Sequence, residues 1–320
     1  MENYPLVVAI VTNWNGIAIE YAGKSILERC IESLLKTDYP NKRIVVVDAN
    51  SSDGSVQFIK KNYPNVHVKS IKDKGISFMI NEGIKEALKR YPNFDYIVMV
   101  ANDLEFTDYK WLKKMVEASK INPSIGMVTC KLKYPNGRIQ HGGVILSPIG
   151  VVLIKDPKSS NVSKYQDYDI NAAALICREA IFKVGGFDEV IGPFGWDDID
   201  YSARMTKKFK IYYTSSTTAV HLESYSVFSK DKKIKKKWTK DEIEFGIRRN
   251  GYIFYLRYKP LMLPFHFVVD AISNFISVGD GIKIRNNILF RIKMQIPALK
   301  EALKMYKQTK IRKFSANLIQ

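Results

Sequence analysis

"RIVVVDANSSDGSVQFIKKNY", residues 43–63, decides the fold class of this chain. Its first part, "RIVVVDA" at 43–49, is an almost unbroken apolar run, which predicts a strand buried on both faces. The following "SSDGSVQFIKKNY" at 51–63 predicts a helix with Ser or Asp as a cap at its start. Asp48 stands at the junction, where the predicted strand ends.

The same alternation of strand and helix continues on both sides of this stretch. The predicted strands are 5–12, 43–49, 66–71, 95–101 and 125–132, and the predicted helices are 25–37, 51–63, 76–91 and 108–121. Such an order forms βαβ units, so we expect an α/β fold with a central, mostly parallel sheet covered on both faces. Ligands bind beyond the carboxyl ends of such strands. Three polar clusters follow strand ends and should meet in one crevice: Thr12–Asn15, Asp48–Ser52 and Asn102–Glu105.

Composition and charge narrow the class of protein further. The chain has 320 residues, of which 46% are hydrophobic, enough for a sizeable core. Its net charge of +18 is unevenly placed, because residues 1–226 carry +4 and residues 227–320 carry +14. A uniformly basic nucleic-acid-binding protein would not show this split. The three cysteines are far apart and lack a metal-binding spacing, which favours a reduced, cytosolic-facing protein.

Neither a signal peptide nor a membrane-spanning helix is expected. The apolar run at 5–12 is short and is followed at once by Asn13. The longest apolar stretch, 260–279, contains a proline, a histidine and an aspartate. We therefore interpret it as a membrane-surface helix or a buried helix.

The residues at the strand ends suit a nucleotide and a metal ion. Asp48 could accept a hydrogen bond from a base or a ribose, although the turn after it also fits an ordinary helix cap. Carboxylates in "NDLE", residues 102–105, suit Mg²⁺ or Mn²⁺ bound together with substrate phosphates, with a surface loop as the alternative. His221, in "TAVHLES", is either a metal ligand or a structural histidine.

Three carboxylates crowd the start of a predicted helix in "GPFGWDDIDYSARM", residues 193–206. Asp197, Asp198 and Asp200 repel one another, although the positive end of a helix tolerates negative charge. Capping needs one or two of them, not three. Residues i and i+3 share a helix face, so Asp197 and Asp200 point alike and Asp198 points elsewhere. One acid could cap the helix while another acts as a general base.

Taken in order, these segments resemble glycosyltransferase family 2, whose members have the GT-A fold. The resemblance covers residues 5–226. Within that family, the chain looks most like the rhamnosyltransferase-like and galactofuranosyltransferase-like subgroups. It is carried by "IVTNWNG", "IVVVDANSSDGS", "KGISFMINEGIKEA", "VMVANDLEF" at the DxD position, "AAALICREAIFKVGGFDE", "FGWDDIDYSAR" at the ED position, and "TAVHLES". The implied fold is a GT-A type, Rossmann-like nucleotide-sugar-binding domain.

The resemblance also implies roles for individual residues. The nucleotide-sugar donor, a UDP-, GDP- or dTDP-sugar, would be bound by Thr12, Asn13, Asn15, Asp48, Asn81, Asn102 and Asp103. A divalent cation, Mn²⁺ or Mg²⁺, would be held by Asp103 and His221, with Glu105 as a further candidate. Asp198 would be the catalytic base, and Trp196 and Asp197 would lie on the acceptor side. The implied reaction is an inverting transfer of a sugar to a hydroxyl of a glycan or lipid-linked acceptor.

Two features of the chain leave alternatives open. The first position of DxD is Ala101, so metal dependence could be weakened, and a catalytically lapsed relative that binds nucleotide or glycan remains a second interpretation. Residues 227–320 form a second unit beyond the catalytic domain 1–226. Basic residues interleaved with aromatic ones predict a helical extension on an anionic, cytosolic membrane surface. A solvated appendage, an oligomer contact and, less favoured, nucleic-acid binding are the alternatives.

Overall fold

The computed structural model describes residues 4–147, 150–169, 172–192, 194–222, 238–273, 276–278, 282–284 and 288–314. The predicted alternation is present in the first part of the chain. Its elements are β1 (Val7–Asn13), β2 (Glu20–Tyr21), β3 (Lys24–Ser25), α1 (Ile26–Leu35), β4 (Lys42–Asp48), α2 (Ser55–Asn62), β5 (His67–Ser70), α3 (Ile76–Arg90), β6 (Tyr96–Ala101), β7 (Leu104–Glu105), α4 (Trp111–Ser119) and β8 (Ile125–Lys133).

Helix α2 begins four residues later than the pattern predicts, because the preceding residues form a turn. The Ser51 amide and hydroxyl both donate to the Asp48 carboxylate, at 2.9 and 2.6 Å. The Ser55 amide donates to Asp53 at 2.9 Å, and Gly54 has a φ of 86°, which a residue with a side chain rarely adopts. The turn therefore delays the helix and holds the end of β4 in place.

The rest of the chain completes the sheet and adds helices. These elements are β9 (Ile139–His141), β10 (Val144–Ser147), β11 (Gly150–Leu153), α5 (Pro157–Ser160), β12 (Lys164–Gln166), β13 (Ala173–Cys177), α6 (Arg178–Val184), α7 (Asp197–Met205), β14 (Lys210–His221), α9 (Lys240–Tyr258), η1 (Pro260–Met262), α10 (Leu263–Ser273), β15 (Ile276–Val278), β16 (Ile282–Ile284) and α11 (Ile288–Met305).

The central sheet confirms the predicted α/β class. Its main path is β12-β14-β8-β13-β6-β1-β4-β5, with β7 added to β14 and β9 added to β8. Strands β5, β4, β1, β6, β8 and β14 all run the same way, whereas β13 and β12 run against them. The carboxyl ends of β1, β4, β6 and β14 therefore lie along one edge of the sheet, which is where ligands bind in such folds.

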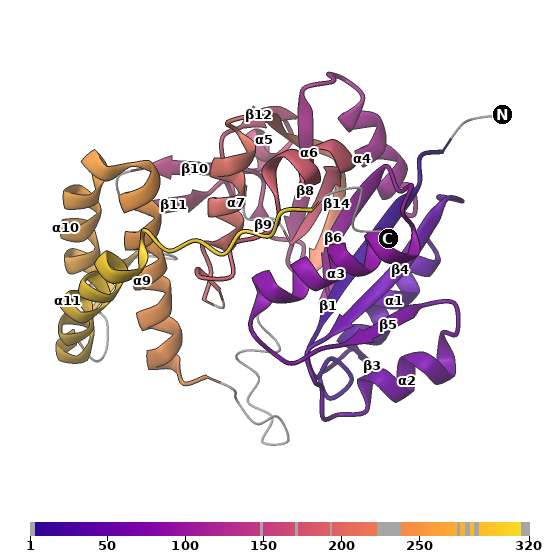
Figure 1. Cartoon of the computed structure of the whole chain (residues 1–320), viewed down its shortest axis with the longest axis horizontal. Coiled ribbons are helices and arrows are strands. Elements are labelled where there is room, and N and C mark those ends of the chain that lie inside the picture. The colour runs from indigo at the N-terminus through magenta and orange to yellow at the C-terminus, as the bar shows by residue number, and fades with distance from the viewer. Residues whose placement is uncertain are drawn as a thin grey trace.

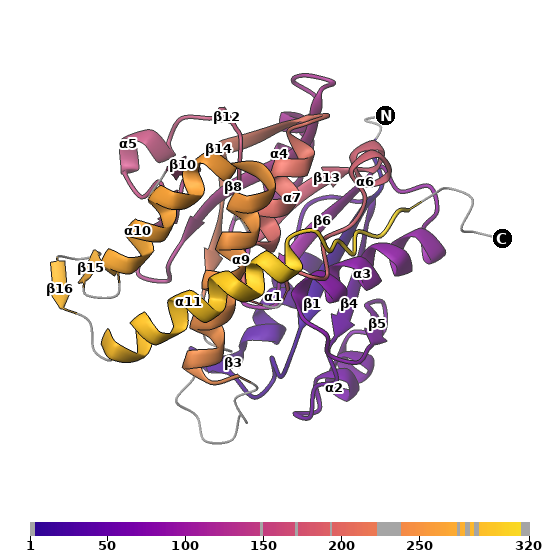
Figure 2. The same ribbon diagram turned by 60° about the vertical axis from the view of Figure 1, so that its left-hand side comes forward.

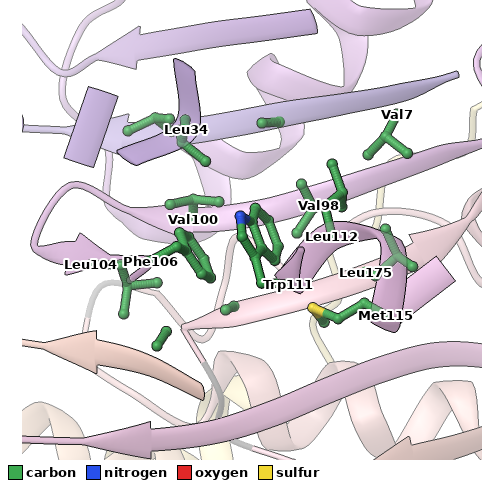
Figure 3. Packing of buried hydrophobic residues seen from close by; sticks show 14 of the residues in the cluster. Val7, Leu34, Val98, Val100, Leu104, Phe106, Trp111, Leu112, Met115 and Leu175 are labelled. Atoms are coloured by element: carbon green, nitrogen blue, oxygen red, sulfur yellow. The ribbon is translucent and has the colours of Figure 1, made fainter. Parts of the chain in front are cut away.

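Each face of the sheet is covered by helices over a hydrophobic core (Figure 1). On one face, Trp111 of α4 lies among aliphatic side chains of β1, β6 and α1 (Figure 3). Its indole ring stacks on Phe106 with ring centroids 3.7 Å apart, and its N–H donates to the Thr37 hydroxyl at 2.8 Å. The other face packs on α3, α6 and α7. This double cover explains why the strands are almost wholly apolar.

Helices α9, α10 and α11 form a group at the end of the molecule opposite β4 and β5 (Figure 1). After α11 the chain runs back to the catalytic domain as an extended segment (Figures 1 and 2). There Ile311 forms a β-bridge with Asp188, the Gly186 amide donates to the Arg312 carbonyl at 2.8 Å, and Phe314 enters the core. At the other end of the group, the Trp238 ring lies edge-on to Phe194 with centroids 4.9 Å apart, so both ends of this helical group contact the sheet-bearing part of the chain.

The aromatic residues of α9 differ from the prediction. Tyr252, Ile253, Phe254 and Tyr255 have no exposed surface, because they pack between α7, α10 and α11. They form the core of the helical unit, so they are not available to a membrane surface. Among the described residues, no helix is both long enough and apolar enough to cross a membrane.

Candidate active site

The polar residues that end β1 and β4 are joined to one another. The Asn13 amide donates to Asp48 at 2.7 Å, and the Asn15 backbone N–H donates to the Ser51 hydroxyl at 2.8 Å. The Asn15 side chain in turn accepts from the Ser52 amide at 2.8 Å. Asp48 is fully buried, and both of its oxygens accept hydrogen bonds from within this group. In this arrangement Asp48 holds the turn in shape.

The next link joins β1 to the end of β6. The Asn102 side-chain amide donates to the Asn13 side-chain oxygen Oδ1 at 2.7 Å, and this bond passes directly over Gly16. A Cβ at Gly16 would lie 2.5 Å from the Asn13 oxygen and 2.7 Å from the Asn102 nitrogen, so only glycine allows the contact. Thr12, one residue earlier on β1, keeps part of its surface exposed. The strand ends thus form one continuous floor.

Asp103 and His221, the predicted metal ligands, are brought together. The Asp103 Oδ1 atom lies 3.2 Å from His221 Nε2, because the end of β14 pairs with β7 immediately after Asp103. The other ring nitrogen, Nδ1, lies 2.9 Å from the Gln140 side-chain oxygen. Since that oxygen can only accept, Nδ1 carries a proton, and Nε2 faces the Asp103 carboxylate. Either a proton on Nε2, which makes an ion pair, or a cation bound to both atoms completes this contact.

The structure corrects the prediction that Glu105 joins this pair. Its carboxylate accepts two hydrogen bonds from Arg29 of α1, at 2.8 and 3.2 Å. Asp103 lies in the turn before β7, whereas Glu105 lies in β7 itself, so the two carboxylates are held in different local backbone conformations. Across the described part of the chain, no group of three or more His, Cys, Asp or Glu side chains is placed to hold a metal ion.

The acidic helix α7 begins without a capping side chain. Its N-cap is Trp196, which has a φ of 69° and, within the described residues, makes no side-chain capping bond. Asp197 is buried, and this burial raises its pKa to about 6. Burial, and next the charge of Asp197, raise the pKa of Asp198 well above its ordinary value. A carboxyl group with a raised pKa is matched to proton transfer near neutral pH.

The third acid of the cluster has a structural role. Asp200 is fully buried and is paired with Arg204 of its own helix and with Arg257 of α9, at 2.9 and 3.3 Å. Tyr258 also donates to it, at 2.7 Å. Arg257 bonds Asp188 as well, at 2.8 Å. The C-terminal unit therefore clamps the acidic helix, which explains why three carboxylates can be tolerated in four positions.

A second group of polar residues near Asp198 was not predicted from the sequence. Asp198 and Asp169 line the same small cavity, together with Thr129 and Ser202. Asp169 accepts from the Thr129 hydroxyl at 2.6 Å, and His141 Nε2 lies 3.4 Å from its other oxygen. His141 and Gln140 are neighbours on β9 and point to opposite faces, so this short strand contacts both the Asp103–His221 pair and the Asp169 group. The sequence signal was "IQHGG", residues 139–143, which carries adjacent polar residues before two glycines.

The structure also differs from the prediction for Asn81. Its side chain is fully buried and is bonded to both the amide and the carbonyl of Phe187, at 2.8 and 2.9 Å. A further bond to Glu189 measures 3.0 Å. Asn81 therefore ties α3 to the loop before the acidic helix, and its polar atoms are not presented to a donor sugar.

The fold and the residues at the edge of its central sheet define a class of protein. A curled, mostly parallel sheet of this order is the GT-A fold of glycosyltransferases, with polar and acidic residues gathered where its parallel strands end. The chain belongs to the family described as glycosyl transferase family 2, whose model matches residues 10–184. The chain is thus a family 2 glycosyltransferase.

Similar curated proteins come from bacterial polysaccharide synthesis. The O-antigen biosynthesis protein RfbC of Myxococcus xanthus is 26% identical over 215 residues, which cover 63% of this chain and 16% of that protein. The poly-beta-1,6-N-acetyl-D-glucosamine synthase of Staphylococcus epidermidis is 29% identical over 135 residues, covering 41% of this chain and 30% of the synthase. The chain therefore matches less than a third of the length of these relatives.

Solved structures share the fold at low identity. The S. aureus protein TarS, residues 1–349 in complex with UDP-GlcNAc, has a TM-score of 0.55 at 13% identity, with 97% of both chains covered. The mannosyltransferase PcManGT from Pyrobaculum calidifontis, in complex with GDP-Man and Mn²⁺, has a TM-score of 0.53 at 15% identity, covering 95% of this chain and 76% of that one. At such identities these likenesses establish the fold alone.

Proposed function

We propose that this chain transfers a sugar from a nucleotide-diphosphate donor to a hydroxyl of a glycan or lipid-linked acceptor, with inversion at the anomeric carbon. The observation that carries the proposal is the Asp103–His221 pair beside the polar floor of Asn13 and Asn102. Both lie where the carboxyl ends of parallel strands meet, the position at which α/β sheets bind ligands. A thermal-shift screen over UDP-, GDP- and dTDP-sugars would identify which nucleotide sugar is the donor.

The residues at the strand ends fit a divalent cation of the Mn²⁺ or Mg²⁺ type. Asp103 supplies a carboxylate oxygen, and His221 supplies a ring nitrogen that Gln140 holds in the required tautomer. One or two protein ligands suffice where substrate phosphates and water complete the shell. When bound, the cation would offset the negative charge that develops on the departing diphosphate.

Asp198 fits the role of the general base. Its carboxylate would accept the proton of the acceptor hydroxyl while the hydroxyl oxygen forms a bond to the anomeric carbon. The bond from that carbon to the phosphate oxygen breaks, and its electron pair leaves with the nucleoside diphosphate. Attack from the face opposite the leaving group inverts the configuration in a single displacement. Trp196 and Asp197, adjacent to the base, would contact the acceptor.

Removal of the carboxylate at position 103 should weaken cation binding. We expect Asp103→Asn to weaken Mn²⁺ affinity by at least about tenfold, because one of two protein ligands is lost. Electron paramagnetic resonance titration with Mn²⁺ alone measures this, and Mn²⁺-stimulated donor hydrolysis should fall in parallel. Glu105→Gln is the matched control, since Glu105 is paired with Arg29, and it should bind Mn²⁺ like the unaltered chain. Equal loss in both variants would contradict the assigned site.

The raised pKa of Asp198 predicts the pH dependence of transfer. The base acts only as a carboxylate, so the rate should fall about tenfold per pH unit as pH drops below this pKa. The limb should lie well above pH 3.8, because burial and the charge of Asp197 raise the pKa of Asp198, with Asp169 contributing in the same direction. Asp197→Asn removes one of these charges, so the limb of its pH–rate profile should move to lower pH. A limb that stays in place would show that Asp198 is not the titrating group.

A relative that binds donor without catalysis is the second candidate, favoured by Ala101 at the first DxD position. It would bind nucleotide and yet leave the donor intact in the presence of Mn²⁺. Charge-driven nucleic-acid binding is the least favoured candidate, and its mark would be strong salt dependence. We also propose that the enzyme lies in the cytoplasm, peripheral to the inner face of the cell membrane.

A further inference from the structure

Helix α10 carries an exposed stripe without charge. Pro264, Phe265, Val268 and Ile272 lie on one helical face, and Leu261 precedes them in η1. Leu261 is 88% exposed, Phe265 66%, Val268 55% and Ile272 52%. The one charged residue of α10, Asp270, lies off this face and is paired with Arg248 and Tyr252 of α9. Large apolar side chains gathered on one face, unlike scattered ones, mark an interaction site.

Helix α11, which packs beside α10, presents a face that is part apolar and part basic. Gln295 of α11 donates to the Phe267 carbonyl of α10 at 2.7 Å, which fixes the two helices together. The exposed positions among the described side chains of α11 fall within about two fifths of the helical circumference at 3.6 residues per turn. They are Ile292, Ile296, Pro297 and Leu303, with Lys293, Lys300 and Lys304 next to them. Apolar residues flanked by lysines are typical of helices that lie in a membrane interface.

The apolar stripe lies close to the acceptor side of the candidate active site. The opposite face of α10 carries His266, whose ring stacks on Tyr255 of α9 with centroids 4.2 Å apart. The same ring lies edge-on to Trp196, with centroids 6.1 Å apart. Trp196 is the N-cap of the helix that begins with Asp197 and Asp198. One helix therefore separates the exposed stripe from Trp196, which stands two residues before the candidate base.

We propose that the exposed faces of α10 and α11 dock the enzyme on an anionic lipid surface and that the acceptor is lipid-linked. The acceptor part rests on the proposed function; the docking part does not. Charge favours an anionic lipid surface as the occupant, because the exposed face of α11 carries three lysines and the one acidic residue of that helix, Glu301, is paired with Arg249. A second copy of the chain fits less well, since a two-fold contact between α11 faces would oppose lysines with lysines. Figures 1 and 2 show α10 and α11 at the outer end of the molecule, away from the sheet.

Vesicle co-sedimentation with the full chain tests this docking surface. Phe265→Glu/Val268→Glu introduces charge at two exposed positions. Substitutions at exposed positions usually change the stability of the fold little. We expect the unaltered chain to bind phosphatidylcholine–phosphatidylglycerol vesicles and to bind pure phosphatidylcholine weakly. The double variant should lose more than about tenfold in affinity for the anionic vesicles. Ile121→Glu/Val162→Glu is the matched control: these side chains are 61% and 59% exposed elsewhere on the molecule, and the control should bind like the unaltered chain.

Several results would overturn the docking surface. They are failure of the unaltered chain to bind anionic vesicles, equal binding by both double variants, or light scattering that shows a dimer broken by the α10 variant without any vesicle binding. Mn²⁺-dependent donor hydrolysis without vesicles should be the same in all three proteins. A chain that binds vesicles yet never hydrolyses or transfers donor would refute the proposed function and leave the lipid-binding surface standing.

Discussion

An Asp198→Asn enzyme is expected to lose sugar transfer by about 10²–10⁴-fold, the contribution typical of a general base. The amide has nearly the shape of the carboxylate but cannot take up the proton of the acceptor hydroxyl. Folding and donor binding should be preserved, because the buried ion pairs of α7 are made by Asp200 and not by Asp198. Initial rates at saturating donor and acceptor measure the loss, and calorimetric titration with donor and Mn²⁺ measures what is retained.

Asp167→Asn is a suitable control, because Asp167 is an exposed carboxylate two residues before the cavity-lining Asp169. It should keep a normal transfer rate. Near-normal turnover by a folded Asp198→Asn enzyme would remove Asp198 from the mechanism. A rate lost together with donor binding would instead indicate that the substitution disturbed the whole site.

The second large effect is on stability. Arg257→Met should lower the free energy of unfolding by about 3–5 kcal/mol, the usual cost of removing one partner from a buried ion pair. Its side chain is 8% exposed, and its guanidinium contacts Asp188 and Asp200, whose side chains are both fully buried. It also donates to the Tyr306 carbonyl at 2.9 Å, at the start of the returning C-terminal segment. Urea denaturation followed by tryptophan fluorescence measures the change.

Lys183→Met provides the comparison for this variant. Lys183 is paired with Glu179 one helical turn away on α6, with side chains 58% and 60% exposed. Exposed pairs of this kind contribute about 0–1 kcal/mol, so the control should be nearly as stable as the unaltered chain. If the two variants lost the same small amount, the clamp between α9 and the acidic helix would not be an important source of stability.

The sequence predicts the catalytic domain well where its signal is local. Strands β1, β4 and β6 are nearly continuous apolar runs, and the polar residue that follows each run marks its end within about a residue. Parallel strands place those ends on one edge, so the approach of Asn13, Asp48 and Asn102 could be expected from topology alone. The nearness of Asp103 and His221 rests on the family resemblance, because β7 and β14 pair across more than a hundred residues.

Other features depend on contacts that no local pattern encodes. Whether a polar side chain faces a ligand or other parts of the chain depends on its hydrogen-bond partners. Asp48 at the end of β4 and Asn81 within α3 both have partners inside the chain. Glu105 is paired with Arg29 of α1, a contact between residues 76 positions apart, and it stands on a two-residue strand that is too short to predict. The charge of residues 227–320 predicted a membrane-binding surface. The sequence did not predict that Arg257 pairs with Asp188 and Asp200 and so clamps the acidic helix.

The most direct test of the account is a crystal of the chain grown with Mn²⁺ and a nucleoside diphosphate, with anomalous diffraction recorded for manganese. The account predicts one anomalous peak bonded to Asp103 and His221, with the diphosphate on its other side and Glu105 still paired with Arg29. A peak held by other residues, or a diphosphate bound away from the ends of β1, β4 and β6, would contradict it.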